Sequence, residues 1–230
     1  MHAPAPSSLT RRRFLMAGAG VLLAGLLGPH AATAIMDASR LRQQMRSRYG
    51  EPGLAALEAW LNLLSRLQEA DLPTRLGEVN DFFNRRIRWV DDLDAWGRED
   101  YWATPLEALG NGRGDCEDYS IAKYLTLRQL GVPGERLRMI YVRARIGRSR
   151  ITQAHMVLGY YATADAEPLI LDNLVPSLTP AAQRIDLDPV FSFNSNGLWV
   201  GDASASRGDP LARLSRWRGA LARMEEQGFL

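Results

Sequence analysis

The single cysteine of this chain, Cys116, lies in the stretch GRGDCEDYSIAKYL, where a helix is predicted to begin. A cysteine at a helix start gains from unpaired backbone N–H groups and from the helix dipole, and both lower the pKa of its thiol. Glycines 110, 112 and 114 precede it and let a substrate backbone come close. Cys116 is therefore a candidate nucleophile, although a lone cysteine is also often an inert, buried side chain.

Thiolate chemistry needs a base that can later give a proton to the leaving group. The chain has three histidines, and two of them, His2 and His30, lie in an N-terminal segment that we expect to be removed. The third, His155, lies in the strand-like run AHMVLGYY. We take His155 as the candidate base, while noting that a histidine on a strand often only completes a hydrogen bond in the core.

An orienting group for this histidine is predicted from the geometry of a hairpin. If Tyr161 pairs with Pro168 across the loop, Asp172 lies opposite Val157 and on the same face as His155. Such diagonal neighbours are about 7 Å apart between backbones, which is within reach of their side chains. A register shifted by one residue would put Asp172 on the opposite face. In the first register Asp172 is the predicted partner of His155.

Three acidic residues, Asp115, Glu117 and Asp118, surround the cysteine. Negative charges beside a thiol raise its pKa, which opposes nucleophilic chemistry. Clustered carboxylate oxygens are ligands that calcium prefers, and a bound cation would reverse the local electrostatics. The alternative is a solvated helix start, where the dipole favours acids without any metal. No twelve-residue EF-hand loop is present, so any further ligands come from elsewhere in the chain.

Residues 1–34 have the pattern of an export signal. Arg11 and Arg12 precede an apolar run over residues 14–27, and small residues lead up to residue 35. The arginine pair resembles a twin-arginine signal, with a Sec signal as the alternative. The run is shorter than the roughly 20 residues that span a bilayer, so we expect a periplasmic protein with no stable membrane insertion after cleavage.

Composition and charge narrow the classes of function further. The 230 residues are 46% hydrophobic and 23% charged, as in a globular domain with one sizeable core. Three of the 28 lysines and arginines and none of the 26 acids lie in residues 1–34, so the remainder carries 25 basic and 26 acidic residues. We therefore expect no nucleic-acid partner.

Hydrophobic periodicity and breaker residues predict an α+β fold, with a central helix that carries Cys116 packed on an antiparallel sheet. The chain divides into the signal over 1–34 and one domain over 35–230, with a helical part over about 37–90 and a core over about 91–230. We predict helices over 54–70, 74–90 with Thr74 as N-cap, 116–130 and from 210 onward, a packed loop over 91–114, and strands over 137–146, 154–161 and 168–174, with a further strand or hairpin over 191–201.

The stretch DYWATPLEALGNGRGDCEDYSIAKYLTLRQLGVP resembles the bacterial transglutaminase-like cysteine proteinases, the LapG-type periplasmic proteases, and HMVLGYY and LILDN resemble their histidine and aspartate strands. The resemblance runs from about Trp89 to Asn173. It implies a papain-like or transglutaminase-like core in which Cys116 attacks a peptide carbonyl, His155 is general base and acid, and Asp172 orients His155. It also implies calcium dependence, with metal ligands on Asp115, Glu117 and Asp118.

The same resemblance implies a substrate and a regulator. The substrate would be a giant adhesin held at the outer membrane and cut near a di-alanine in its N-terminal region, so that the cell leaves a biofilm. An inner-membrane receptor for cyclic di-GMP would hold the enzyme inactive. Two other classes remain open. One is a transglutaminase-type acyl transferase, which uses the same triad, and the other is a non-catalytic binding module with a vestigial triad.

Overall fold

A computed structural model describes residues 36–147, 151–201 and 206–230 of the chain. The export signal predicted over residues 1–34 lies outside these ranges. Within them, no helix combines the length and the apolar character needed to cross a membrane. The described residues therefore bear on the domain predicted over 35–230 and leave the signal untested.

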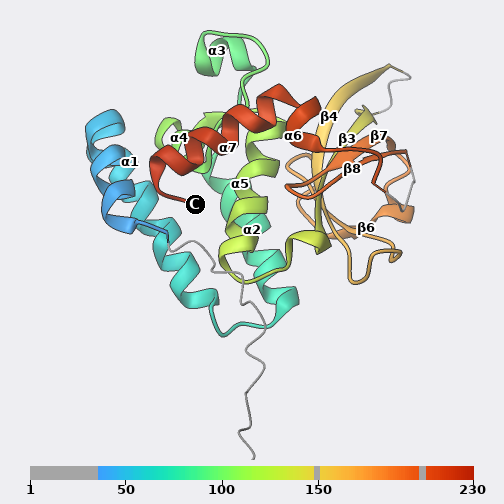
Figure 1. Ribbon diagram of the computed structural model, residues 1–230, viewed down its shortest axis with the longest axis horizontal. Coiled ribbons are helices and arrows are strands. Elements are labelled where there is room, and N and C mark those ends of the chain that lie inside the picture. Colours follow the sequence, from blue (N-terminus) through green and yellow to red (C-terminus); the bar gives the residue numbers. More distant parts are fainter. Residues whose placement is uncertain (1–35, 148–150, 202–205) are drawn as a thin grey trace, which may run out of the picture. The chain divides into compact units, whose positions relative to one another are not determined.

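Helices make up most of the domain up to residue 129, the strands of the larger sheet follow, and two helices end the chain (Figure 1). The helices are α1 (Ala38–Leu67), α2 (Leu72–Arg86), α3 (Asp92–Trp96), α4 (Pro105–Asn111), α5 (Cys116–Gln129), η1 (Gly134–Arg136), η2 (Ala181–Gln183), α6 (Pro210–Arg213) and α7 (Ser215–Gln227). The strands are β1 (Arg88–Trp89), β2 (Arg113–Gly114), β3 (Leu137–Arg145), β4 (Thr152–Tyr160), β5 (Leu169–Leu171), β6 (Thr179–Pro180), β7 (Leu187–Phe193) and β8 (Leu198–Val200). This combination confirms the predicted α+β class.

The first two helices begin at aspartate caps. Asp37 accepts a hydrogen bond from the backbone of Arg40 at the start of α1, which then bends at Gly50, where φ is 64°. Asp71 accepts from the backbone N–H of Thr74 at 2.8 Å and so caps α2. The prediction of Thr74 as N-cap was wrong, because the aspartate three residues earlier reaches the same orphan N–H groups.

The segment over 91–114, predicted as a packed loop, contains two short helices and a strand. Helix α4 has a capping box, in which the Thr104 hydroxyl accepts from the backbone of Glu107 and the Glu107 carboxylate accepts from the backbone of Thr104. After it, β2 pairs in parallel with β1. This pairing delivers the chain directly to Asp115 and the start of α5.

Helix α5 is the central element, as the sequence predicted. Most of its residues are buried, and it packs against β4, α2 and α4 (Figure 1). A helix that is apolar on nearly all sides has to lie inside the domain, because no orientation leaves a polar face for solvent. Its first residue is Cys116.

The six-stranded sheet in the described part of the chain has the order β6-β5-β4-β3-β7-β8 with antiparallel neighbours. Leu158 pairs with Leu171 and Tyr160 pairs with Leu169. This is the register predicted from the loop between Tyr161 and Pro168, and it is confirmed. The hairpin expected over 191–201 is also present as β7 and β8.

The sheet has different apolar clusters on its two faces. The larger core fills the space between the helices and one face, and its fully buried side chains include Trp60, Phe83 and Trp217. On β4, Met156 and Leu158 belong to this core. The intervening residue of β4 contributes to a separate cluster on the opposite face, together with residues of β3 and β5: Ile140, Val142, Ala144, Val157 and Ile170.

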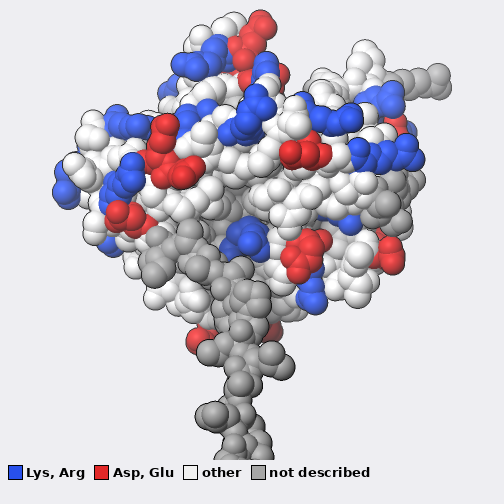
Figure 2. Space-filling model, viewed as in Figure 1, with Lys and Arg blue, Asp and Glu red and all other residues white. Residues whose placement is uncertain are grey.

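The C-terminal segment folds as two helices instead of the single helix predicted. Leu214 leaves the helical conformation between α6 and α7, with φ −110° and ψ 87°. At the end of α7 the carbonyl of Gly228 accepts from the backbone N–H of Asp37 at 2.8 Å, which ties the two ends of the domain together. Acidic and basic side chains are interspersed over the face shown in Figure 2.

A glycine substitution in α4 tests its packing against α1, and one in α7 serves as the comparison. A Cβ added at Gly110 would overlap the ring of Tyr49, so we expect Gly110→Ala to lower the free energy of unfolding by about 1–3 kcal/mol. Gly219 in α7 has room for a Cβ, so Gly219→Ala should raise it by up to about 1 kcal/mol. Urea unfolding measures both. A Gly110→Ala protein as stable as the parent would contradict this packing.

Candidate active site

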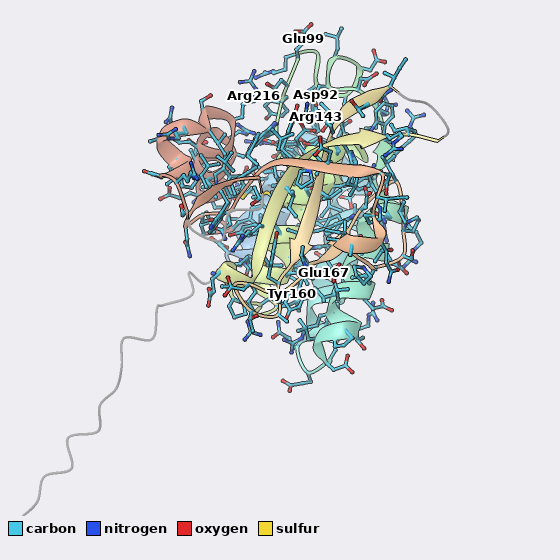
Figure 3. All side chains as sticks on the ribbon, turned by 90° about the vertical axis from the view of Figure 1, so that its right-hand side faces the viewer. Asp92, Glu99, Arg143, Tyr160, Glu167 and Arg216 are labelled. Carbon is cyan, nitrogen blue, oxygen red and sulfur yellow. The ribbon has the colours of Figure 1, made fainter. Side chains whose placement is uncertain are left out.

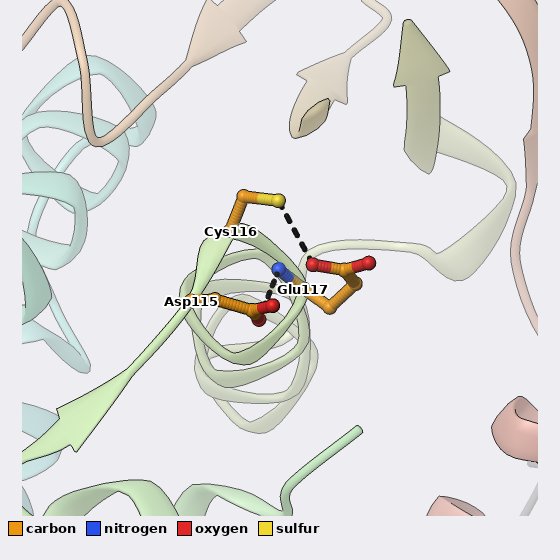
Figure 4. Close-up of side chains that lie close together, drawn as sticks. All are labelled: Asp115, Cys116 and Glu117. Carbon is orange, nitrogen blue, oxygen red and sulfur yellow. Dashed lines mark hydrogen bonds between the residues drawn. The ribbon is translucent and has the colours of Figure 1, made fainter. Parts of the chain in front are cut away.

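Cys116 is held at the first position of α5 by its neighbours. Asp115 is the N-cap, and its carboxylate accepts from the backbone N–H of Glu117 at 3.2 Å. The Cys116 thiol donates to Oε2 of Glu117 at 2.8 Å, as Figure 4 shows. The thiol therefore lies where the unpaired N–H groups of α5 begin, but it has a carboxylate as its direct partner.

The start of α5 lies against the strand that carries His155. The hydroxyl of Ser120 donates to the carbonyl of Met156 at 3.2 Å, and α5 as a whole packs against β4. The first turns of α5 therefore lie against the strand in which Met156 directly follows His155.

His155 and Asp172 form a direct pair. Nε2 of His155 lies 2.8 Å from Oδ1 of Asp172, and both side chains are buried. The register between β4 and β5 places Asp172 just past the end of β5, diagonal to His155. Because Nε2 faces Asp172, Nδ1 is the ring nitrogen left for a nucleophile. The assignment of Cys116, His155 and Asp172 to a catalytic triad stays a prediction.

Asp172 is ionised by its surroundings. Burial tends to raise its pKa, but hydrogen bonds from His155, from the backbone of Leu174 and from Arg184 outweigh burial and lower the pKa to about 2. Asn84 also donates to the backbone carbonyl of Asp172 at 2.8 Å, which links α2 to this site. The carboxylate is therefore negative and fixed in position at neutral pH.

Arg184, which the sequence did not suggest, is the main countercharge of Asp172. Its Nη2 lies 2.7 Å from Oδ2 of Asp172 and 2.8 Å from Oδ2 of Asp186, and its side chain is 4% exposed. Lys123 on α5 is also near, but burial lowers its pKa to about 7, against opposing effects of Asp172 and Asp81. A lysine with that pKa is not a constant positive charge, whereas a guanidinium is. Arg184 lies in the segment between β6 and β7, and the pairing of β6 with β5 brings this segment close to Asp172.

An acidic cluster surrounds the start of α5. Ligand oxygens of Asp92, Asp115 and Asp118 lie within 4.8 Å of one another, and Glu117 is similarly close to Asp115 and Cys116. The structure thus brings together the three acids predicted as metal ligands and adds Asp92, from α3. The only sequence signal for Asp92 was its place in the run DDLD, which alone does not point to a site.

The pKa values of the acidic side chains and of Cys116 in this cluster are raised by burial and by their mutual repulsion. Burial raises the pKa of Asp92 to about 6 and that of Asp115 to about 10, and neighbouring carboxylates add to both shifts. Burial also raises the pKa of Asp118 well above its usual range. The pKa of Cys116 is raised by burial and then by Glu117 and Asp115. A cation among these oxygens would lower all four pKa values.

The cluster also has an acceptor without a donor. Asp118 accepts from the backbone of Ala103 at 2.7 Å and from Nε1 of Trp96 at 3.1 Å. Asp92 accepts from the backbone of Tyr101 through Oδ2, but its Oδ1 is buried and has no partner in the described part of the chain. Buried polar atoms are normally satisfied. The donor set, four carboxylates with one unsatisfied buried oxygen, fits a hard divalent cation.

A groove of about 710 Å³ opens beside this cluster. Its walls include Asp115 and Glu117 at the start of α5 and the rings of Trp102, Tyr141 and Phe191. Asp92, Glu99 and Arg216 lie around the same end of the domain in Figure 3, and all three line the groove. The groove therefore has an acidic and aromatic lining that includes both neighbours of Cys116 in the chain.

Replacing Arg184 tests whether it is the countercharge of Asp172. Breaking a buried ion pair leaves an unpaired charge, so we expect Arg184→Met to lower the free energy of unfolding by about 3–5 kcal/mol. The matched variant Arg143→Met removes an exposed pair with Asp188 and should cost less than about 1 kcal/mol. Urea unfolding at neutral pH separates the two, and equal losses would contradict the assignment.

Arg184→Met should also change the pH at which the protein unfolds in acid. A carboxylate whose pKa is lowered in the folded state stabilises the fold above its unfolded pKa near 4, and this is lost as the pH falls through about 2 for Asp172. Without Arg184 the pKa of Asp172 should rise, so unfolding should begin at a higher pH than in the parent protein. Circular dichroism across an acid titration measures the shift.

Comparisons with known proteins agree with this geometry. The family model described as bacterial transglutaminase-like cysteine proteinase matches residues 63–184, which include Cys116, His155 and Asp172. The solved structure of Legionella pneumophila LapG is 36% identical, with a TM-score of 0.70 over 83% of this chain and 99% of that one. An EGTA-treated and a calcium-bound form of the same protein have TM-scores of 0.72 and 0.69 at the same identity, over 83% and 82% of this chain and 99% of theirs. A search of curated protein sequences gave no match.

The family match extends over more than half of the chain, and the likeness to solved structures extends over most of it at substantial identity. Sequence, fold and site therefore lead to one conclusion. This chain belongs to the bacterial transglutaminase-like cysteine proteinase family.

Proposed function

We propose that this cysteine protease is a periplasmic, calcium-dependent endopeptidase that cuts a large cell-surface adhesin. The observation that carries the proposal is the buried pair of His155 and Asp172, whose strand β4 packs against the central helix that begins at Cys116. A thiol at a helix start and an imidazole oriented by a carboxylate are the groups that nucleophilic attack on a peptide carbonyl requires. The aromatic groove beside it gives an extended substrate a place to lie.

The proposed reaction has two stages. Cys116 Sγ gives its proton to Nδ1 of His155 and attacks the carbonyl carbon, and the peptide C–N bond then breaks as His155 returns the proton to the leaving amine. Water next attacks the thioester, again through His155, and releases the acid and the free thiol. Asp172 keeps the imidazole oriented and stabilises its protonated form.

Calcium is the cation that best suits the acidic cluster. Asp92, Asp115 and Asp118 would hold it, with Glu117 at the edge of the site, since hard carboxylate oxygens are its preferred ligands. When bound, calcium supplies positive charge that offsets these carboxylates and orders the start of α5. Their charge would otherwise keep the Cys116 thiol protonated, because burial and Glu117 raise its pKa.

The cellular part of the proposal is supported by the family resemblance. The twin-arginine-like pattern in residues 1–34 supports export to the periplasm. The substrate is an adhesin anchored at the outer membrane and cut near a di-alanine in its N-terminal region, which releases the cell from a biofilm. An inner-membrane cyclic di-GMP receptor inhibits the enzyme by binding it.

Replacing the nucleophile tests the reaction class. Incubating the parent protein with the N-terminal region of the adhesin should give two fragments, and mass spectrometry should find a cut peptide bond. Cys116→Ala should lower the rate by at least about 10³-fold, because the covalent step is lost. Circular dichroism confirms that the variant is folded. An isopeptide product without cleavage would instead indicate an acyl transferase, and equal cleavage by Cys116→Ala would exclude Cys116 as nucleophile.

Calcium dependence is tested separately with paired variants on α3. Cleavage by the parent protein should stop in EGTA and return when calcium is restored. Asp92→Asn removes a carboxylate from the cluster and should weaken calcium binding by about tenfold or more in calorimetry. Asp94→Asn changes an exposed carboxylate on the same short helix and should behave like the parent. Cleavage that is indifferent to EGTA would contradict the calcium proposal while leaving the protease intact.

A further inference from the structure

A second groove lies on the face of the sheet that points away from α5. Its floor is the smaller apolar cluster of β3, β4 and β5, which includes Ile140, Val142, Val157 and Ile170. The segments over 161–168 and 181–189 form its sides, and its volume is about 510 Å³. This volume is within the range of ligand sites, roughly 300–1,000 Å³. The acids and the cysteine of the candidate active site do not line it.

Arg138 lies in the wall of this groove, and no acidic side chain of the described residues forms an ion pair with it. Its side chain is 6% exposed, and its guanidinium carbon lies 4.4 Å from the ring centroid of Tyr161 and 4.0 Å from that of Trp199. Its Nε is buried without a partner, and no hydrogen bond from its guanidinium group to an acceptor is present within the described ranges. A guanidinium stays charged at all relevant pH values, and a buried charge without a partner is costly.

Arg184 adds a second unsatisfied donor to the same wall. Its Nε and Nη2 are taken by Asp186 and Asp172, but Nη1 is buried and has no partner in the part of the chain that the structure describes. Arg184, counted with its backbone, is 5% exposed. Asp165 also lines the groove, yet no ion pair joins it to either arginine in the described ranges. The groove thus combines an aliphatic floor with cationic donors that have spare hydrogen-bonding capacity.

This combination selects one kind of occupant. A carboxylate is planar and matches the two parallel N–H groups of a guanidinium, and the paired hydrogen bonds are strong when water is excluded. An aliphatic side chain next to that carboxylate would bury its surface on Ile140, Val157 and Ile170. A plain inorganic anion would leave this floor uncovered, and a neutral apolar ligand would leave the arginines unpaired. A short stretch of peptide with an acidic residue between aliphatic ones meets both requirements.

We propose that the groove over Ile140, Val157 and Ile170 binds an acidic, aliphatic peptide segment of a partner protein, with its carboxylate on Arg138 and its second hydrogen bond from Nη1 of Arg184. Arg184 also donates to Asp172, so the docked segment contacts the arginine that pairs with the partner of His155. The peptide therefore binds at a groove that Cys116 does not line. Binding there requires no cleavage, so it stands independently of the proposed function.

The test uses two synthetic tripeptides that differ in one group, acetyl-Leu-Asp-Leu-amide and acetyl-Leu-Asn-Leu-amide. Each is titrated into the ¹⁵N-labelled full chain while backbone amide signals are followed by NMR. The aspartate peptide should shift the signals of Val142, Val157 and Ile170 in a saturable way and should bind about tenfold or more tightly than the asparagine peptide. Equal affinities, shifts confined to other regions, or no saturation up to about 5 mM would overturn the proposal.

Variants on β3 locate the charge that matters. Arg138→Met should lower affinity for the aspartate peptide by about tenfold or more, and Arg138→Lys should recover part of it. Arg143→Met removes a guanidinium on the same strand that is exposed and paired with Asp188, so it should leave the titration unchanged. Equal effects of Arg138→Met and Arg143→Met would overturn the assignment. If Arg138→Met does not fold, the comparison of the two tripeptides on the parent protein still decides.

Discussion

The contact between the start of α5 and strand β4 is the constraint on which the other features of this fold depend. The hydroxyl of Ser120 donates to the carbonyl of Met156, and most of α5 is buried between helices and sheet. Because α5 is buried along most of its length, it cannot turn or slide without opening the core. Cys116, the first residue of α5, is therefore held in place by a helix that packs against the strand that carries His155.

Charge is distributed in opposite senses on the two sides of this contact. Beside Cys116, carboxylates from α3 and α5 crowd together with a buried oxygen unsatisfied, which calls for a cation. On the far face of the sheet, Arg138 and Arg184 have spare donors, which call for an anion. Arg184, which lines the second region, is also the ion-pair partner of Asp172 and so connects that region to the pair of His155 and Asp172. The domain thus has an acidic cluster suited to a cation near Cys116 and a basic groove suited to an anion on the far face of the sheet.

The sequence predicted the features that are set by local pattern. The helix at 116–130, the three strands and the register that brings Asp172 to His155 follow from periodicity and loop length, and the structure has them. Helix α4 was missed although Thr104 and Glu107 form a capping box that is visible in the letters TPLE, because the glycines and aromatic residues around it suggested a loop. The cap of α2 was assigned to Thr74 instead of Asp71 because Pro73 was read as a break before the helix, whereas it lies in the first turn.

Asp92 and Arg184 were beyond prediction for a different reason. Each reaches the site from a segment with no chemical motif, and its role depends on which distant chain portions pack together. The orphaned nitrogen atoms of Arg138 and Arg184 are likewise a property of three-dimensional surroundings. Cys116, His155 and Asp172 remain the reacting groups predicted from the sequence, and the structure adds the charged side chains that surround them.

The pairing of β4 with β5 has a consequence for how such proteins can diverge. The pairing, in which Leu158 faces Leu171, is held by strand hydrogen bonds and by the core beneath them, while the connection over 161–168 only closes the hairpin. That connection also supplies one side of the groove on the far face. Changes in its composition at constant length would reshape the groove and leave the strand pairing that places Asp172 diagonal to His155. Substitutions in this one surface loop can therefore alter the groove without moving the strands that hold His155 and Asp172 together.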